Sequence, residues 1–140
     1  MIVLDTNVIS AMMQASPDER VVDWLNSQPS ESIWTTSVSL FEILYGINSL
    51  AKGTRRQALQ AAFELAMQQD LDGRVLDFDS AAAVESARIS SKLRSCGQTV
   101  EMRDVQIAGI VSARQGTLAT RNTKHFDSVG ISLVNPWEVR

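Results

Sequence analysis

The chain alternates short apolar runs with longer segments in which apolar residues recur every three or four positions. The short runs are enriched in β-branched and aromatic residues, a composition that favours buried strands. They predict strands over residues 2–4, 33–36, 75–78, 117–120 and 131–134.

The segments between these runs have the spacing of amphipathic helices. Residues 16–19 (Ser-Pro-Asp-Glu) combine a capping box with Pro at the first helical position, which predicts the start of a short helix. Thr54 is expected to cap a long helix, and Asp79-Ser80 is expected to open another. Further helices are predicted over residues 38–50 and 102–115.

Strands separated by helices predict an α/β fold, with a central, mostly parallel sheet flanked by helices. A length of 140 residues is typical of one domain, so we expect residues 1–140 to form a single domain. Ligands of such sheets bind beyond the carboxyl ends of the strands. Asp5 directly follows the first predicted strand, and Arg121-Asn122 follow a late one, which makes this edge the place to look for a site.

The composition is that of an ordinary globular protein, with 44% hydrophobic and 21% charged residues, and it excludes the disordered and fibrous classes. No apolar run approaches the roughly 18 residues that suggest a membrane span. The first residues lack a basic region and reach an acid at Asp5, unlike a signal peptide. Cys96 is the single cysteine and cannot form an internal disulfide, so we expect a cytoplasmic protein.

The formal net charge of −3 argues weakly against a nucleic-acid partner, because such proteins usually carry a basic surface. Divalent cations held by some of the carboxylates would reverse the local charge at a site. Net charge therefore does not decide whether the chain binds nucleic acid.

Three acids stand out, and each also has an ordinary structural explanation. Asp5 can cap the helix that begins after the first strand. Glu42 has capping-box spacing from Ser39, although a helix start at Ser37 would place it inside the helix with its carboxylate directed into an apolar recess. Asp104 lies in a first helical turn, where an acid complements the helix dipole.

Together these acids predict a metal site. Carboxylate oxygens from separate segments are the ligands that Mg²⁺ or Mn²⁺ prefers, with waters completing the coordination. Softer metals are disfavoured, because the only Cys and the only His do not form a ligand cluster. The chemistry that most often uses such a site is phosphoryl transfer or phosphodiester hydrolysis.

At these residues the sequence resembles the PIN domain family, and in particular the VapC/FitB type of toxin ribonuclease from toxin–antitoxin modules. The likeness covers the whole chain, and its segments occur in the family's order and spacing. They are Ile2-Val-Leu-Asp-Thr-Asn-Val-Ile-Ser10, Ser37-Val-Ser-Leu-Phe-Glu-Ile-Leu-Tyr-Gly46, Asp104-Val-Gln-Ile-Ala108, Thr120-Arg-Asn-Thr-Lys-His-Phe126 and Asn135-Pro-Trp137.

The resemblance implies a Mg²⁺- or Mn²⁺-dependent endoribonuclease that inhibits translation, with RNA such as tRNA as substrate. It implies that Asp5, Glu42 and Asp104 are the catalytic metal ligands. It also implies a cognate antitoxin protein that covers the acidic cleft, and a homodimer. Supporting roles in positioning water or phosphate are expected for Thr6, Asn7, Thr120 and Arg121, and Asn122 is a further supporting residue of the site.

One position departs from part of the family. Some members have a fourth acid where this chain has Asn122, which offers a carbonyl oxygen but no charge. A second metal ion would therefore bind less tightly, and the number of ions stays open. Asp127 follows five residues later and is interpreted as a surface residue.

Other polar and aromatic residues are given structural interpretations. His125 has no nucleophile to pair with and is interpreted as an incidental surface residue, with contact to a substrate phosphate as the alternative. Trp24, Trp34 and Trp137 are assigned to the core or a dimer interface rather than to base stacking. The basic residues Lys52, Arg55 and Arg56 are interpreted as a solvated helix start, with contact to an RNA backbone as the alternative.

Three alternative functions remain open at this point. A phosphohydrolase of the haloacid-dehalogenase type would use Asp5 as a nucleophile, but it needs a second Asp where this chain has Asn7. A binding protein that has lost catalysis is compatible with Asn122. A DNA nuclease would use the same metal chemistry, because recognition of the 2′-hydroxyl lies elsewhere.

Overall fold

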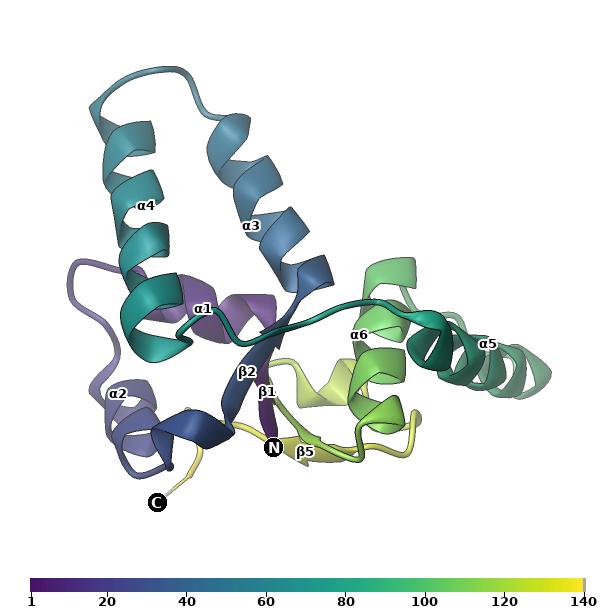
Figure 1. Cartoon of the computed structure of the whole chain (residues 1–140). Helices are drawn as coiled ribbons and strands as arrows, with labels where there is room; N and C mark the ends of the chain where they lie inside the picture. The colour runs from purple at the N-terminus through teal and green to yellow at the C-terminus, as the bar shows by residue number, and fades with distance from the viewer. Residues whose placement is uncertain (140) are drawn as a thin grey trace.

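The computed structural model describes residues 1–139, which form a five-stranded parallel sheet with helices on both faces (Figure 1). The strand order is β3-β2-β1-β4-β5, and every neighbouring pair is parallel. The predicted α/β fold is therefore confirmed. The strands are β1 (Ile2–Leu4), β2 (Ile33–Thr36), β3 (Val75–Leu76), β4 (Thr117–Ala119) and β5 (Ser132–Val134).

The helices follow the strands in the order expected of a parallel sheet with crossovers. In Figure 1, α3 and α4 stand side by side as an antiparallel pair that rises from one end of the sheet, while α5 lies against α6. The helices are α1 (Thr6–Met12), α2 (Glu19–Asn26), α3 (Ser37–Asn48), α4 (Thr54–Leu65), α5 (Ser80–Ser95) and α6 (Met102–Ala113).

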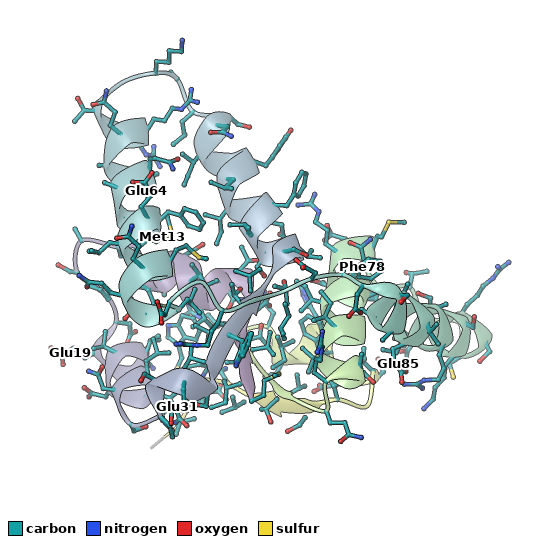
Figure 2. The ribbon with its side chains drawn as sticks, viewed as in Figure 1. Met13, Glu19, Glu31, Glu64, Phe78 and Glu85 are labelled. Carbon is teal, nitrogen blue, oxygen red and sulfur yellow. The ribbon has the colours of Figure 1, made fainter. Side chains whose placement is uncertain are left out.

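Two hydrophobic clusters cover the two faces of the sheet, because successive strand residues point in opposite directions. Val3 and Leu118 pack with residues of α5 and α6. Their neighbours Leu4 and Ala119 pack on the other face with residues of α1, α2, α3 and α4. Charged side chains such as Glu64 project outward from this framework (Figure 2).

Several helices are capped by other residues than those predicted. The helix expected from residues 16–19 begins at Glu19, because Asp18 is its cap and accepts a hydrogen bond from Arg20 N at 2.9 Å. Thr54 is the first residue of α4 and does not cap it, since Gly53 occupies the cap position. Glu42 lies inside α3 rather than in a capping box, because Thr36 caps that helix through Ser39 N.

The predicted third strand is too long. β3 stops at Leu76, and the chain then leaves the sheet because Phe78 N donates to Ser37 Oγ at 3.2 Å. Asp79 caps α5 as expected, accepting from Ala82 N at 2.9 Å. Among residues 1–139, no helix is both long enough and apolar enough to span a membrane.

Candidate active site

Asp5 lies where the central strand β1 passes into α1, and it is almost completely buried at 6% exposure. Its carboxylate caps α1 by accepting from Thr6 N at 2.8 Å, so the structural interpretation of Asp5 is correct. The other oxygen accepts from the Thr120 hydroxyl at 2.8 Å. Capping does not exclude chemistry, because the same carboxylate also lines an open cavity.

Glu42 reaches the same place from the neighbouring strand–helix connection. β2 lies beside β1 and leads directly into α3, which carries Glu42 with its side chain 24% exposed. Its Oε1 lies 3.3 Å from the Thr6 hydroxyl, and its Oε2 forms an ion pair with Arg103 Nη1 at 3.5 Å. The partly buried carboxylate therefore has polar partners on both oxygens, a hydroxyl of α1 and a basic group of α6.

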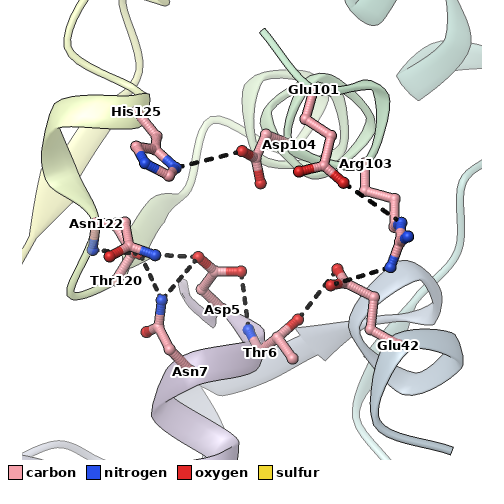
Figure 3. A network of polar contacts seen from close by, with 10 residues as sticks. All are labelled: Asp5, Thr6, Asn7, Glu42, Glu101, Arg103, Asp104, Thr120, Asn122 and His125. Carbon is pink, nitrogen blue, oxygen red and sulfur yellow. Dashed lines mark hydrogen bonds and ion pairs between the residues drawn. The ribbon is translucent and has the colours of Figure 1, made fainter. Parts of the chain in front are cut away.

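Asp104 comes from the first turn of α6 on the opposite side of the cavity. Its Oδ2 lies 3.5 Å from His125 Nδ1. Figure 3 shows how Asp5, Glu42 and Asp104 surround one space, although they come from distant parts of the sequence. This cavity of about 710 Å³ is also lined by Thr6, Asn7, Asn122 and Arg121, together with Asp18, Glu101, His125 and Trp137.

Thr120 and Asn7 hold the central carboxylate in place. The buried Thr120 hydroxyl donates to Asp5 and accepts from Asn7 Nδ2 at 3.2 Å and from Asn122 N at 3.1 Å. Asn7 Nδ2 also lies 3.4 Å from Asp5 Oδ2. All the residues predicted for the site are thus brought together, with Thr120 behind Asp5 and the others on the cavity wall.

The three acids share an electrostatic environment that disfavours their charge. Burial raises the pKa of Asp5, and the hydrogen bonds from Thr120 and Thr6 only partly offset this. Burial likewise raises the pKa of Glu42 and of Asp104, with Asp5 raising both further by charge repulsion. Clustered carboxylates with raised pKa values are typical of functional sites, because a bound cation relieves both penalties.

The donor set fits a hydrated Mg²⁺ or Mn²⁺ ion. As the side chains of residues 1–139 lie, no three acidic, His or Cys groups converge closely enough to coordinate one ion directly. Mg²⁺ does not require such convergence, because it keeps several waters and commonly binds through one or two carboxylates. Asp5, Glu42 and Asp104 supply only oxygen ligands around one cavity, which is the chemistry that this ion prefers.

Sequence reasoning missed part of the polar surroundings. The interpretation of His125 as incidental is not supported, because this side chain faces Asp104 and lines the cavity. Arg103 was not singled out, yet it bridges Glu42 and Glu101, with Nε 3.8 Å from Glu101 Oε1. Its position beside Asp104 in the sequence was the only available signal, and it does not reveal a contact with α3.

Comparison with known proteins decides the family. The PIN domain family matches residues 2–131, which is nearly the whole chain. The chain belongs to the PIN domain family. A structure of FitAcB from Neisseria gonorrhoeae has a TM-score of 0.89 and 33% identity, and the match covers 99% of this chain and 100% of that one.

Two relatives identify the branch of the PIN domain family. VapC ribonuclease Y4jK of Sinorhizobium fredii is 35% identical over 138 residues, covering 99% of both chains. Plasmid stability protein StbB of Pseudomonas syringae pv. tomato is 36% identical, again covering 99% of both. This PIN domain is therefore of the VapC/FitB type, as the resemblance of its motifs predicted.

Proposed function

We propose that this PIN domain is a metal-dependent endoribonuclease and the toxin of a toxin–antitoxin module. The observation that carries the proposal is the convergence of Asp5, Glu42 and Asp104 on one cavity at the carboxyl edge of the sheet. Membership of the VapC/FitB type, which includes a relative named as a ribonuclease, supports RNA as the substrate class.

In this proposal the three acids hold one or more Mg²⁺ or Mn²⁺ ions. A bound ion would polarise the phosphate and make a water nucleophilic at neutral pH. The chain's own contribution is orientation: Thr6 N and Thr120 Oγ1 fix the two oxygens of Asp5, while the Thr6 hydroxyl lies against Glu42. Asn122 lines the cavity beside them and adds an oxygen without charge, so a second ion would bind more weakly.

The partners follow from the same assignment. We expect an antitoxin protein that occupies the acidic cleft, cytoplasmic action, and arrest of translation through cleavage of RNA such as tRNA. A homodimer is also expected, and α3 offers a surface for it. Phe41 and Tyr45 are 58% and 62% exposed there and stack on each other with ring centroids 5.9 Å apart.

Cleavage of total cellular RNA by antitoxin-free protein tests the proposal. The wild-type protein with Mg²⁺ or Mn²⁺ should give discrete fragments, and EDTA should prevent them. Asp5→Asn should also abolish cleavage, because it removes a charged ligand while keeping the side-chain shape. Asp127→Asn is the matched control, since Asp127 is exposed and does not line the cavity.

Each contrary outcome has a definite meaning. Intact RNA under every metal condition, from folded protein shown to be free of its partner, would refute the ribonuclease assignment and favour a binding role. Cleavage of DNA but not RNA by the same preparation would replace the substrate class. A covalent phosphate trapped on Asp5 would replace hydrolysis by water with a phosphohydrolase mechanism.

A further inference from the structure

Arg121 is placed unusually for a surface arginine. Its guanidinium carbon lies 5.0 Å from the centroid of the Trp137 ring, within the range of a cation–π contact. Within residues 1–139, its side chain makes no ion pair or hydrogen bond. The residue is nevertheless exposed at the wall of the acidic cavity, so its charge is available to a ligand there.

The backbone of Arg121 is tied to the centre of the site. Arg121 N donates to Asn7 Oδ1 at 3.1 Å, and the preceding residue is Thr120, whose hydroxyl donates to Asp5. The position of Arg121 relative to Asp5 is therefore set by two hydrogen bonds on adjacent residues. A group bound by Arg121 would have a defined place relative to the proposed metal ligands.

Trp137 is fixed as well, which makes it a rigid support. Its ring is buried at 7% exposure, which agrees with its assignment to the core. Its N donates to Asn135 Oδ1 at 3.0 Å, and its carbonyl accepts from Arg20 Nη1 at 3.1 Å. A buried ring cannot stack on a nucleotide base, but its face can hold the guanidinium of Arg121.

The nearby acid does not neutralise Arg121. Asp18 lines the same cavity, and Arg121 contributes to lowering its pKa to about 2. The larger causes of that shift are the hydrogen bonds from Arg20, whose Nε and Nη2 lie 3.1 and 2.8 Å from the two oxygens of Asp18. Asp18 is therefore already paired with Arg20.

A stacked arginine is well suited to bind phosphate. Stacking occupies the face of the guanidinium and leaves its N–H edge free for two parallel hydrogen bonds to oxygen atoms. Among residues 1–139, Arg121 is the one arginine or lysine on the wall of this cavity, whose acidic residues are Asp5, Asp18, Glu42, Glu101 and Asp104. Beside the proposed metal ions, Arg121 therefore adds a cationic side chain that offsets the repulsion between these carboxylates and an RNA backbone.

We propose that Arg121, stacked on Trp137, binds an RNA backbone phosphate that flanks the cleaved one. Trp137 is then a positioning residue that acts through Arg121. The inference rests on the proposed ribonuclease function and adds a specific contact to it. It also assigns the main basic contact inside the cleft to Arg121, rather than to Arg55 and Arg56 of α4.

The test is the salt dependence of RNA binding. Fluorescein-labelled bulk tRNA is titrated with protein in Mg²⁺ at several KCl concentrations. Every protein in this titration, including the reference, also carries Asp5→Asn so that the RNA stays intact. Arg121→Gln should lower affinity about tenfold at 150 mM salt, the effect of one charge-assisted contact. It should also make the slope of log affinity against log salt shallower by about 0.7–0.9.

Three further variants separate this contact from general charge or folding effects. Arg94→Gln is the matched control, because Arg94 is exposed at the end of α5 and does not line the cavity. Arg121→Lys should keep the salt slope and still lose affinity, since an ammonium cannot form the two-pronged contact. Trp137→Leu should weaken binding, and Trp137→Phe should restore it.

The outcomes distinguish the inference from the function on which it rests. Wild-type protein that cleaves RNA, together with Arg121→Gln that binds it with unchanged slope and affinity, would overturn the inference alone. Equal losses for Arg121→Gln and Arg94→Gln would also overturn it, because they would show a general charge effect. Protein that neither binds nor cleaves RNA would overturn the proposed function and this contact with it.

Discussion

The substitution Asp5→Asn should separate metal binding from folding. Without metal, the change removes a buried charge whose pKa is raised by burial, which favours the folded state. It also costs a hydrogen bond, because the new amide cannot accept from both Thr6 N and Thr120 Oγ1. One such bond contributes about 1 kcal/mol, so in EDTA the free energy of unfolding should change by no more than about 1 kcal/mol.

With Mg²⁺ the two proteins should differ clearly. At a concentration of about 100 times its Kd, Mg²⁺ stabilises the wild-type fold by about 2.7 kcal/mol. For a chain of this length, that corresponds to a rise in Tm of about 8 °C. If Asp5→Asn weakens Mg²⁺ binding about 100-fold, the same concentration gives only about 0.4 kcal/mol, a rise of about 1 °C.

Thermal unfolding with Mg²⁺ and with EDTA measures both effects, and Asp127→Asn serves as the control with the full Mg²⁺ response. An Asp5→Asn protein that keeps the full Mg²⁺ shift would show that Asp5 is not a metal ligand. A loss of about 3 kcal/mol or more in EDTA would show instead that Asp5 is mainly a structural residue.

Further predictions concern the surroundings of the site and the packing below it. Thr120→Val should cost about 1–3 kcal/mol and reduce RNA cleavage, because it removes the hydroxyl that donates to Asp5 Oδ2. Thr120→Ser should restore both the stability and the activity, as measured by denaturant unfolding and by cleavage assays. In EDTA the free energy of unfolding should fall as pH rises from about 4 through the raised pKa values of Asp5, Glu42 and Asp104, because the folded state binds more protons than the unfolded state in that range. Thermal melts in which stability rises over the same pH range would contradict this prediction. Gly109→Ala should destabilise by about 1–3 kcal/mol, because the new Cβ meets the Ser86 hydroxyl and lies 2.7 Å from Ala82 O. Gly46→Ala, whose Cβ meets nothing within 4 Å, should stabilise α3 by about 0.5–1 kcal/mol, and denaturant unfolding compares the two.

The strands and most helices could be predicted because their signals are local. β2 is at the predicted residues, and α6 ends at Ala113, two residues before the predicted end. Errors occurred where a distant contact decides the boundary. β3 ends early because the backbone after Leu76 hydrogen-bonds to Ser37, a contact that no nearby residue announces.

The site shows the same division between local and distant information. Asp5 could be selected because it follows a strand, and Asp104 because it lies in a first helical turn. Glu42 could be selected because apolar residues flank it, and all three acids match a family motif. The pairing of Arg103 with Glu42 depends on how α6 lies beside α3, and the stacking of Arg121 on Trp137 joins two segments through the tertiary fold. A single sequence does not contain those distances.

In the proposed reaction, water hydrolyses an RNA phosphodiester in the cleft formed by Asp5, Glu42 and Asp104. The most direct measurement is the chemistry of the new RNA ends, obtained with Mg²⁺ in ¹⁸O-labelled water. Hydrolysis by water should leave a terminal phosphate that carries one labelled oxygen in the first product formed, at the earliest time points. EDTA and Asp5→Asn should each suppress this product. Ends bearing a 2′,3′-cyclic phosphate, or cleavage that persists in EDTA, would contradict the account, because the 2′-hydroxyl or a metal-free route would then perform the reaction.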